Sequence, residues 1–484
     1  MKRFYKITFI FTALLVTSII SCKKSFLEEA PRTVTIADLL NSPEDGAQKF
    51  IGAVYNKLYT WHVHSFPWIG ISSITSDDAD KGSLLGDVGT DKDLLDHWTF
   101  DENTFSFNEV WRGNYEGIGR ACYALQYIPI MDLPQQEKDR YIGEAKLLRA
   151  YFYWNLVRVF GGVPKIDHVL ESLDEIIAAT NRASVAEIYA FMEEDLNDAI
   201  AKLPPTIPAS ENGRVSKYAA EALLAKVSLY QQKWIQANSM CDNIIANTQF
   251  QLLDDYSMIW REAGEFSSES IWEVNAIGTQ PNLGVEGWAG TQYPRGPIGW
   301  GFNTPSQDLV DTYAAADKRK AGTIIVTGQT MWDGKFIDPV TAINPYYNFK
   351  AYFSTTQETY DGDNWQCNKN YRIFRLGEIY LIKAEAENAL NNNEEAKKYL
   401  NKIRTRAGLP NTLATDEQLK DSIYAERRLE MAFEHDRTFD LIRTGRAEAV
   451  LGPLGFKPDR HNVFPIPQIQ IDKSGNKLQQ NPNY

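Results

Sequence analysis

Apolar residues recur every three or four positions over several long stretches of the chain, which is the spacing of helices with one face toward a core. Phe50, Val54 and Leu58 show this spacing near the beginning. Ser184, followed three positions later by Glu187, is typical of a capping box and marks a helix start. The pattern predicts four long helices, over residues 46–59, 107–127, 135–160 and 184–203. The protein is therefore predicted to be mainly α-helical.

Two later segments, 216–246 and 375–404, share a pattern of small residues. Each contains two alanines 12 positions apart. This pattern is typical of tetratricopeptide repeats, in which small residues lie where two helices cross closely. With the helices at 140–160 and 426–446, four such helix pairs are predicted. Their irregular spacing along the chain excludes a continuous solenoid and favours one wall of a compact domain.

Two segments, 61–106 and 261–369, are rich in tryptophan, tyrosine, glycine and proline and show no sustained period. Long irregular connections on a regular scaffold often carry function, so we expect a ligand-facing layer of loops with minor β-hairpins. The first segment also contains many aspartates. A structural calcium ion is one interpretation, but the spacing of an EF-hand loop is absent, and turn formation by aspartate is favoured.

The segment 426–446 combines an apolar stripe with many charges. Leu429, Ala432 and Phe433 recur at the spacing of a core-facing helix, and a turn and a second short helix follow. Arginines alternate with carboxylates around the stripe, which indicates a partly buried ion-pair network that fixes helix packing. Glu430 and Glu434 share one helix face, so a pair of catalytic carboxylates is the alternative interpretation.

Residues 1–21 have the pattern of a secretory signal peptide, with basic residues before an apolar run that is short for a membrane span. Ser21 then precedes Cys22, as in a bacterial lipobox. We therefore predict that Cys22 receives lipid and begins the mature chain. An ordinary cleaved signal peptide with an incidental cysteine is the alternative.

Composition and charge exclude some classes of protein. The net charge is −13, whereas nucleic-acid-binding proteins present basic patches. The motifs of serine hydrolases, zinc proteases and nucleotide-binding loops are absent, although the many acidic residues leave a glycosidase pair open. The other cysteines are far apart and odd in number, which argues against a disulfide framework or a zinc site. They are predicted to be buried thiols, at Cys122, Cys241 and Cys367.

Several segments resemble the SusD/RagB family of outer-membrane nutrient-binding lipoproteins. The stretch ERRLEMAFEHDRTFDLIR at 426–443 is similar to the family pattern E-R-R-x-E-x-x-F-E-x-x-R-x-F-D-L-x-R. The ending PIPQIQIDKSGNKLQQNPNY is similar to the family's C-terminus, although Gln470 stands near the place of an acidic residue. Segments at 145–164 and 301–313 resemble further family motifs, as does the start after Cys22.

The resemblance covers the chain from Cys22 to Tyr484 and implies a SusD-like fold. In that fold a single domain, 22–484, has four tetratricopeptide-type helix pairs in a scaffold at 47–60, 107–260 and 370–450. The implied function is binding of oligosaccharides by a lipid-anchored protein, without catalysis or a cofactor, outside a Gram-negative outer membrane. The implied partner is a TonB-dependent outer-membrane transporter of the SusC type. A RagB-like peptide-binding protein, a secreted glycan-active enzyme and a tetratricopeptide interaction scaffold are the alternatives.

The ligand site is predicted from the position of aromatic residues, because binding residues vary across this family. Rings in glycine- and proline-interrupted segments, or next to turns, have no helix or strand face that obliges them to be core. Sugars pack on such rings, while polar side chains bind the hydroxyl groups. The predicted ligand-binding residues are Asp78, Trp288, Tyr293, Trp300 and Trp332. The alternative location is around Trp61 and Trp68.

Overall fold

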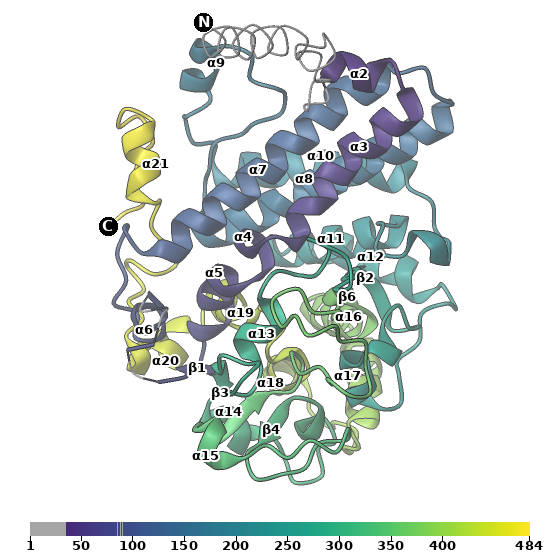
Figure 1. Cartoon of the computed structure of the whole chain (residues 1–484). Coiled ribbons are helices and arrows are strands. Elements are labelled where there is room, and N and C mark those ends of the chain that lie inside the picture. Colours follow the sequence, from purple (N-terminus) through teal and green to yellow (C-terminus); the bar gives the residue numbers. More distant parts are fainter. Residues whose placement is uncertain (1–34, 85, 88, 90) are drawn as a thin grey trace, which may run out of the picture. The chain divides into compact units, whose positions relative to one another are not determined.

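The computed structural model describes residues 35–84, 86–87, 89 and 91–484 (Figure 1). The predicted signal peptide and Cys22 lie outside the described residues. The described part divides into two compact units, 35–49 and 50–484. The first contains α2 (Ile36–Leu40) and the beginning of α3 (Pro43–Asn56), which continues into the second. None of the described helices combines the length and the apolar character needed to cross a membrane.

The long helices predicted from hydrophobic periodicity are present. After α3 and the 3-10 helix η2 (Lys57–Tyr59) they are α7 (Phe105–Tyr127), α8 (Gln135–Phe160) and α10 (Val185–Lys202). Helix α8 ends at Gly161, whose φ of +71° suits glycine. Helix α10 begins with the predicted capping box, in which Ser184 and Glu187 bond to each other's backbone. The predicted mainly helical fold is therefore confirmed.

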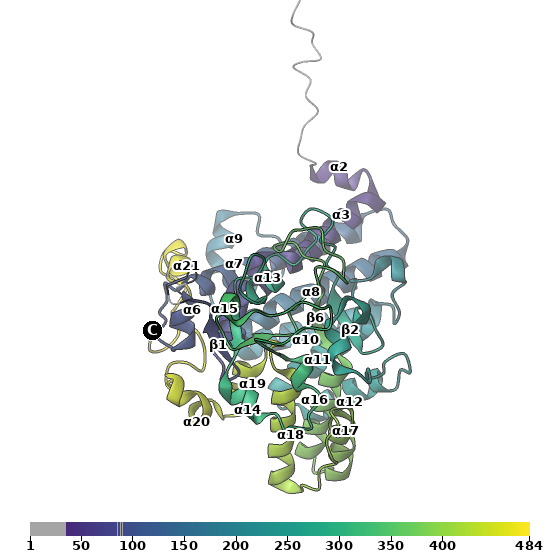
Figure 2. The same ribbon diagram turned by 60° about the horizontal axis from the view of Figure 1, so that its bottom comes forward.

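The two segments with paired alanines form the predicted helix pairs (Figure 2). They are α11 (Lys217–Tyr230) with α12 (Trp234–Ile245), and α16 (Leu376–Ala389) with α17 (Asn393–Arg406). Neighbouring helices pack in the order α7, α8, α10, α11, α12 and α16, and both α17 and α18 (Asp416–Met431) pack on α16. The last pair is arranged differently, because α19 (Arg437–Arg443) packs on η3 (Gly70–Ile74) and α20 (Ala447–Leu451).

The segment 61–106, expected to be an irregular layer of loops, contains several short helices and one strand. Its elements are α4 (Trp61–His64), α5 (Phe66–Ile69), the π-helix η3, β1 (Ala79–Gly82) and α6 (Asp91–Asp96). All residues of α5 and η3 are buried. Because these helices have only four to six residues, and α5 and η3 are buried on all sides, no helical period could appear in the sequence.

The segment 261–369 and its flanks contribute short strands and helices. These are β2 (Ser270–Val274), α13 (Trp288–Gln292), β3 (Phe302–Pro305), α14 (Gln307–Thr312), β4 (Ile324–Val326), α15 (Pro339–Ala342), β5 (Tyr346–Asn348) and β6 (Tyr371–Arg375). The strands pair antiparallel as β1–β3, β2–β6 and β4–β5. The first two pairs join distant parts of the chain, so the predicted hairpins are wrong for them. The β1–β3 pair, with Ala79 opposite Pro305, joins the two irregular segments.

The remaining helices lie between or after these elements. They are η4 (Ile128–Ile130), α9 (Leu173–Ala178), η5 (Ala209–Glu211), η6 (Tyr256–Trp260), η7 (Glu262–Gly264), η8 (Lys320–Gly322), η9 (Gly452–Leu454) and α21 (Gln468–Lys473).

The thiols of Cys122, Cys241 and Cys367 are buried and free, as predicted, and burial raises the pKa of each.

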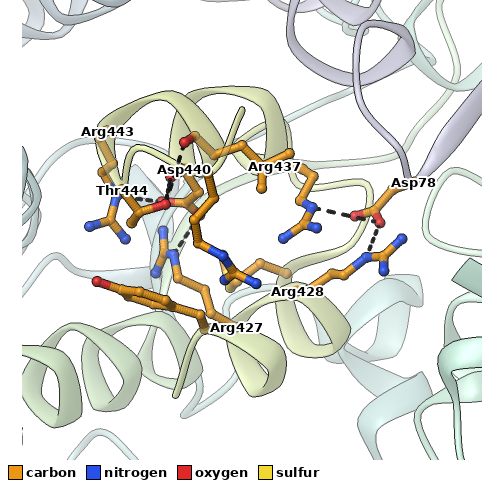
Figure 3. A pocket seen from close by; sticks show the side chains of 11 residues that line it. Asp78, Arg427, Arg428, Arg437, Asp440, Arg443 and Thr444 are labelled. Carbon is orange, nitrogen blue, oxygen red and sulfur yellow. Dashed lines mark hydrogen bonds and ion pairs between the residues drawn. The ribbon is translucent and has the colours of Figure 1, made fainter. Parts of the chain in front are cut away.

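The charges of 426–446 form a buried ion-pair network, as predicted (Figure 3). Asp440 accepts hydrogen bonds from Nε of Arg427 and from Nε of Arg443, each at 2.6 Å. Arg428 extends from α18 to Asp78, 2.6 Å away, which lies next to β1. Bidentate and shared pairs of this kind hold elements from distant parts of the chain in one arrangement.

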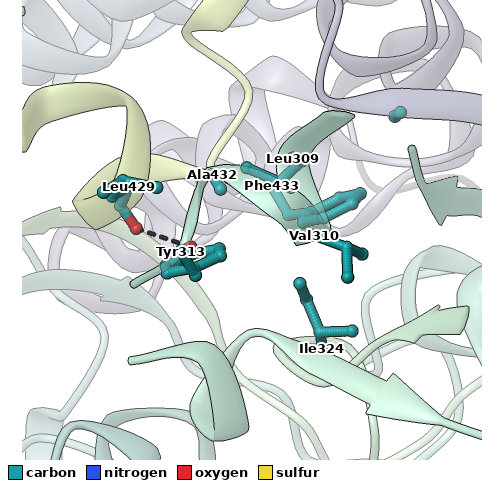
Figure 4. Close-up of a cluster of buried hydrophobic side chains, with 8 residues drawn as sticks. Leu309, Val310, Tyr313, Ile324, Leu429, Ala432 and Phe433 are labelled. Atoms are coloured by element: carbon teal, nitrogen blue, oxygen red, sulfur yellow. Dashed lines mark hydrogen bonds between the residues drawn. The ribbon is translucent and has the colours of Figure 1, made fainter. Parts of the chain in front are cut away.

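The apolar stripe of the same segment is buried, but its last two members lie beyond the helix. Helix α18 ends at Met431, and Phe433 has a φ of +64°. The prediction of one continuous helical stripe is therefore wrong at Ala432 and Phe433, because the chain turns sharply to bring the Phe433 ring inward. That ring packs with the buried side chains of α14 and β4 (Figure 4). The cluster consists of Ala79, Leu309, Val310, Tyr313, Ile324, Leu429, Ala432 and Phe433.

Candidate functional site

Three of the predicted ligand-binding residues are buried. Asp78 is 1% exposed and binds Arg428, so its carboxylate belongs to the ion-pair network. Burial raises the pKa of Asp78, although the Arg428 guanidinium opposes the shift. Trp288 lies in α13 against the edge of Tyr371, with ring centroids 5.3 Å apart. Tyr293 stacks on another tyrosine and is 1% exposed. The structure therefore encloses all three side chains, and Trp288 is 5% exposed.

Trp332 is partly exposed, but another side chain occupies one face of its ring. The guanidinium of Arg261 lies 3.4 Å from the ring centroid. The other aromatic contact is an edge of Tyr352, 6.4 Å away. Among the described residues no ring pair joins Trp332 to Trp300, so the structure does not bring these two predicted residues together.

Trp300 belongs to a cluster of three partly exposed rings, which we call the tryptophan patch: Trp61, Trp300 and Trp365. Trp61 and Trp365 are stacked, with centroids 5.0 Å apart and planes 23° apart. Trp300 lies 5.6 Å from Trp365 at 38°. The buried ring of Phe66 supports the patch, 5.7 Å from Trp61 and 6.1 Å from Trp300. The patch thus brings one predicted residue together with Trp61, the alternative location, whereas Trp68 is buried.

The three tryptophans come from three separate segments, and backbone bonds fix each of them. The amide N–H of Trp300 donates to the carbonyl of Gly290 at 3.0 Å. The carbonyl of Trp365 accepts from the amide of Gly287 at 2.8 Å. Gly287 has a φ of +69°, and a Cβ at this position would lie 2.9 Å from the Trp365 ring and 3.0 Å from the Trp61 ring. Only glycine therefore allows the two indoles to approach the turn this closely.

Polar groups surround the patch. A carboxylate oxygen of Glu286 accepts a hydrogen bond from the backbone amide of Trp61 at 2.8 Å, and Glu286 is partly exposed. Arg295 pairs with Asp87 at 2.5 Å, and Arg295 also donates to the carbonyl of Trp300. Hydrogen bonds from Ser83 and from a neighbouring backbone amide lower the pKa of Asp87 to about 2, so this carboxylate is ionised at neutral pH. Donors and acceptors therefore lie beside the partly exposed tryptophans.

The aspartate-rich stretch binds basic side chains. Asp77 accepts a hydrogen bond from Arg437 at 2.7 Å. Asp93 forms an ion pair with Lys81 at 2.7 Å, and Asp91 forms one with Lys92 at 2.9 Å. In the described part of the chain no three His, Cys, Asp or Glu side chains are grouped so that they could hold a metal ion. Asp77, Asp91 and Asp93 therefore act as ion-pair partners within the fold.

The alternative carboxylate pair, Glu430 and Glu434, is enclosed by cations. Glu430 is fully buried, and Glu434 accepts from Arg375 at 2.7 Å and from Lys350 at 2.6 Å. Burial favours the neutral form of Glu430, but the nearby guanidinium groups hold its pKa well below the usual range. These groups belong to Arg319, Arg375 and Arg406. A permanently ionised, enclosed carboxylate cannot deliver a proton, so the packing interpretation of this pair is favoured.

Comparison with known proteins gives matches along almost the whole chain. The sequence model of the SusD family matches residues 268–484. A second model, described as starch-binding associating with outer membrane, matches residues 44–229. The SusD-like protein P25 of Formosa agariphila is 26% identical over 97% of this chain and 95% of its own length. A SusD-like protein of Bacteroides ovatus is 22% identical over 89% and 80% of the two chains.

Solved structures show the same fold. A laminarin-binding SusD-like protein superposes with a TM-score of 0.79 at 29% identity, covering 91% of this chain and 99% of its own. Surface glycan-binding protein A from Bacteroides thetaiotaomicron, in complex with laminarihexaose, has a TM-score of 0.76 at 25% identity and covers 91% and 100%. Sequence alone missed Trp365 as a patch residue, and the available signal was the Asp361–Gly362 pair, typical of a turn, three to four positions before it.

Proposed function

Because the chain belongs to the SusD/RagB family, we propose that it is a non-catalytic, cell-surface oligosaccharide-binding protein whose ligand lies on the tryptophan patch. The observation that carries this proposal is the cluster of three fixed, partly exposed indoles with charged groups beside it. Sugar rings offer apolar C–H faces to aromatic rings and hydroxyl groups to polar side chains. A rigid patch binds such a ligand without ordering its own side chains first.

Laminarihexaose is the first ligand to test, since two structural relatives at 25–29% identity bind laminarin or this hexasaccharide. We expect the full-length chain to bind it in isothermal titration calorimetry. Trp300→Ala and Trp365→Ala should each weaken binding about tenfold, because an aromatic contact contributes about 0.5–1.5 kcal/mol beyond the area it buries. Trp61→Ala serves as a third test from a separate segment.

Trp332→Ala is the matched control, because its ring contacts Arg261 and lies outside the patch. The control should bind as the unsubstituted chain does, and all variants should keep its melting temperature. Unchanged affinity in all three patch variants would show that the ligand binds elsewhere. Chromatography of the incubated hexasaccharide checks the non-catalytic assignment, which new, shorter products would contradict.

We also propose a lipid anchor at Cys22, on the outer face of the outer membrane. Support comes from the Ser21–Cys22 pair after the apolar leader and from the family's description as outer-membrane-associated. Each buried methylene of an acyl chain adds about 0.8 kcal/mol to membrane binding. Cys22→Ala should move the protein from the membrane fraction to the soluble fraction of cells, as measured by immunoblotting. Full retention in the outer membrane would contradict the anchor.

The proposed partner is a TonB-dependent outer-membrane transporter, with the helical scaffold toward the transporter and the patch toward the ligand. A wall of packed regular helices offers a rigid surface, whereas loops offer variable chemistry. Photo-crosslinkers at exposed positions of α12 and α17 should capture the transporter in cells. Crosslinkers at 361–363, which flank the patch, are the comparison. If crosslinkers at 361–363 captured the transporter and those on α12 and α17 did not, the proposed orientation would be contradicted.

A further inference from the structure

A polar cavity of about 450 Å³ lies where the turns of the helix pairs meet. We call it the repeat-turn pocket. Its walls come from the turn between α11 and α12, the turn between α16 and α17, the beginning of α18 and the end of α19. It shares no residue with the tryptophan patch. Its volume is within the range of about 300–1,000 Å³ that is usual for small-ligand pockets.

Two aromatic side chains line the repeat-turn pocket. Trp234 is the first residue of α12 and is partly exposed. Among the described residues no aromatic ring and no cation packs on its indole; the nearby Arg443 guanidinium lies over the Tyr230 ring instead. Tyr424 of α18 is also partly exposed and has the Arg446 guanidinium 5.3 Å from its ring. The partly exposed Trp234 indole thus lines the pocket without an aromatic or cationic partner among the described residues.

Amide side chains surround the indole. Gln232 and Asn391 stand at equivalent places in the two turns, with φ of +56° and +64°, and both are exposed. The side chain of neither makes a hydrogen bond within the part of the chain that the structure describes. Deeper in, Asn393 receives a bond from Asn388 at 3.0 Å and donates to Asp416 at 3.1 Å. The pocket thus offers free amide donors and acceptors beside an aromatic face.

The charges of the pocket are mostly neutralised within it. Both carboxylate oxygens of Glu385 accept hydrogen bonds from the guanidinium of Arg443, at 2.6 and 2.9 Å. Lys420 forms an ion pair with Glu417 at 3.0 Å. Asp416 is the remaining acid, and it accepts from an amide. With no free cation among the lining residues described, a phosphate or sulfate has no counter-charge here. A neutral ligand with many hydroxyl groups fits this set of amides and one carboxylate.

We propose that the repeat-turn pocket is a second binding site for neutral saccharides, with Trp234 as the stacking ring and Asn391 and Gln232 as hydrogen-bonding groups. This inference goes beyond the proposed function, and the second site would stand even if the tryptophan patch did not bind sugar. Two sites on one chain allow a single polysaccharide to be held at two points. The second contact is then intramolecular and raises the overall affinity for long chains.

The experiment titrates laminarihexaose into the full-length chain and into Trp300→Ala/Trp365→Ala, by calorimetry. We expect the double variant to retain one hexasaccharide per chain. Adding Trp234→Ala should weaken that remaining binding about tenfold or more. Adding Asn391→Gly instead should weaken it severalfold, because glycine keeps the positive φ and removes only the amide. Ile235→Ala is the control, since Ile235 is the next residue, is 75% exposed and does not line the pocket.

The outcomes separate this proposal from the proposed function. If the double variant binds as the unsubstituted chain does but loses binding with Trp234→Ala, the pocket is supported and the patch is not. If the double variant shows no binding, or if its binding is insensitive to both Trp234→Ala and Asn391→Gly, the second site is refuted. A ¹⁹F resonance of 5-fluorotryptophan, assigned to Trp234 by its loss in Trp234→Phe, should also shift on titration.

Discussion

Replacing Glu430 by alanine is expected to lower the free energy of unfolding by about 3–5 kcal/mol, the usual cost of removing one member of a buried ion pair. Glu430 is fully buried, and its carboxylate binds Arg319, Arg375 and Arg406. Without it, these guanidinium groups keep their charge while losing a central partner, and they cannot reach water. Urea unfolding monitored by tryptophan fluorescence measures the difference.

Glu417→Ala is the matched control, because Glu417 lies near the start of the same helix and its side chain is 83% exposed in its pair with Lys420. Surface ion pairs contribute little to stability, so this variant should unfold at the same urea concentration as the unsubstituted chain. If Glu430→Ala were as stable as the control, the buried network would not hold the fold together.

The network also predicts a dependence on pH. The pKa of Glu430 is lower in the folded chain than its ordinary value of 4.5, so its contribution to stability is complete above that pH and is lost as the pH falls below it. The unsubstituted chain should therefore lose stability steeply below about pH 4.5, and Glu430→Ala should show a shallower decline. Parallel curves for the two proteins would contradict this assignment.

The second large effect is expected at Phe433, where truncation to alanine should cost about 3–5 kcal/mol. The ring is 5% exposed and packs between the end of α18 and the side chains of α14 and β4 (Figure 4). Alanine leaves a cavity and keeps the positive φ, so no backbone strain is relieved. Thermal unfolding followed by circular dichroism measures the loss.

Leu413→Ala provides the comparison, since Leu413 is 92% exposed and its truncation removes no core contact. Phe433→Leu should recover part of the stability, because leucine refills some of the volume. If Phe433→Ala and Leu413→Ala had the same melting temperature, the Phe433 ring would not be part of the core and its placement would be incorrect.

The scaffold could be predicted from sequence because its signals are local. Helix α8 carries a long apolar period and ends at Gly161, and α10 starts at a capping box, so each boundary depends on neighbouring residues. Paired alanines predicted two close helix crossings for the same reason. At Phe433 the local signal failed, because contacts with the distant α14 and β4 determine where the chain turns.

The proposed binding surface could be predicted only in part, because it depends on which loops meet. Trp61 and Trp365 are more than 300 residues apart, and nothing local says that they stack. The burial of Trp288 could not be predicted either. Its segment has the glycine-rich sequence of an exposed loop, but it forms a short buried helix. The sequence of Asp78 and its neighbours likewise does not show that Arg428, 350 positions further along the chain, binds its carboxylate. Of the five predicted residues, Trp300 is the one that lies in the patch.

The central claim is that an oligosaccharide binds on the tryptophan patch, and a crystal structure of the full-length chain with laminarihexaose tests it most directly. The account predicts density for sugar rings against Trp61, Trp300 and Trp365, with hydroxyl groups near Glu286 or Arg295. A well-ordered complex in which the hexasaccharide lies elsewhere, while the patch is open to solvent and empty, would contradict it.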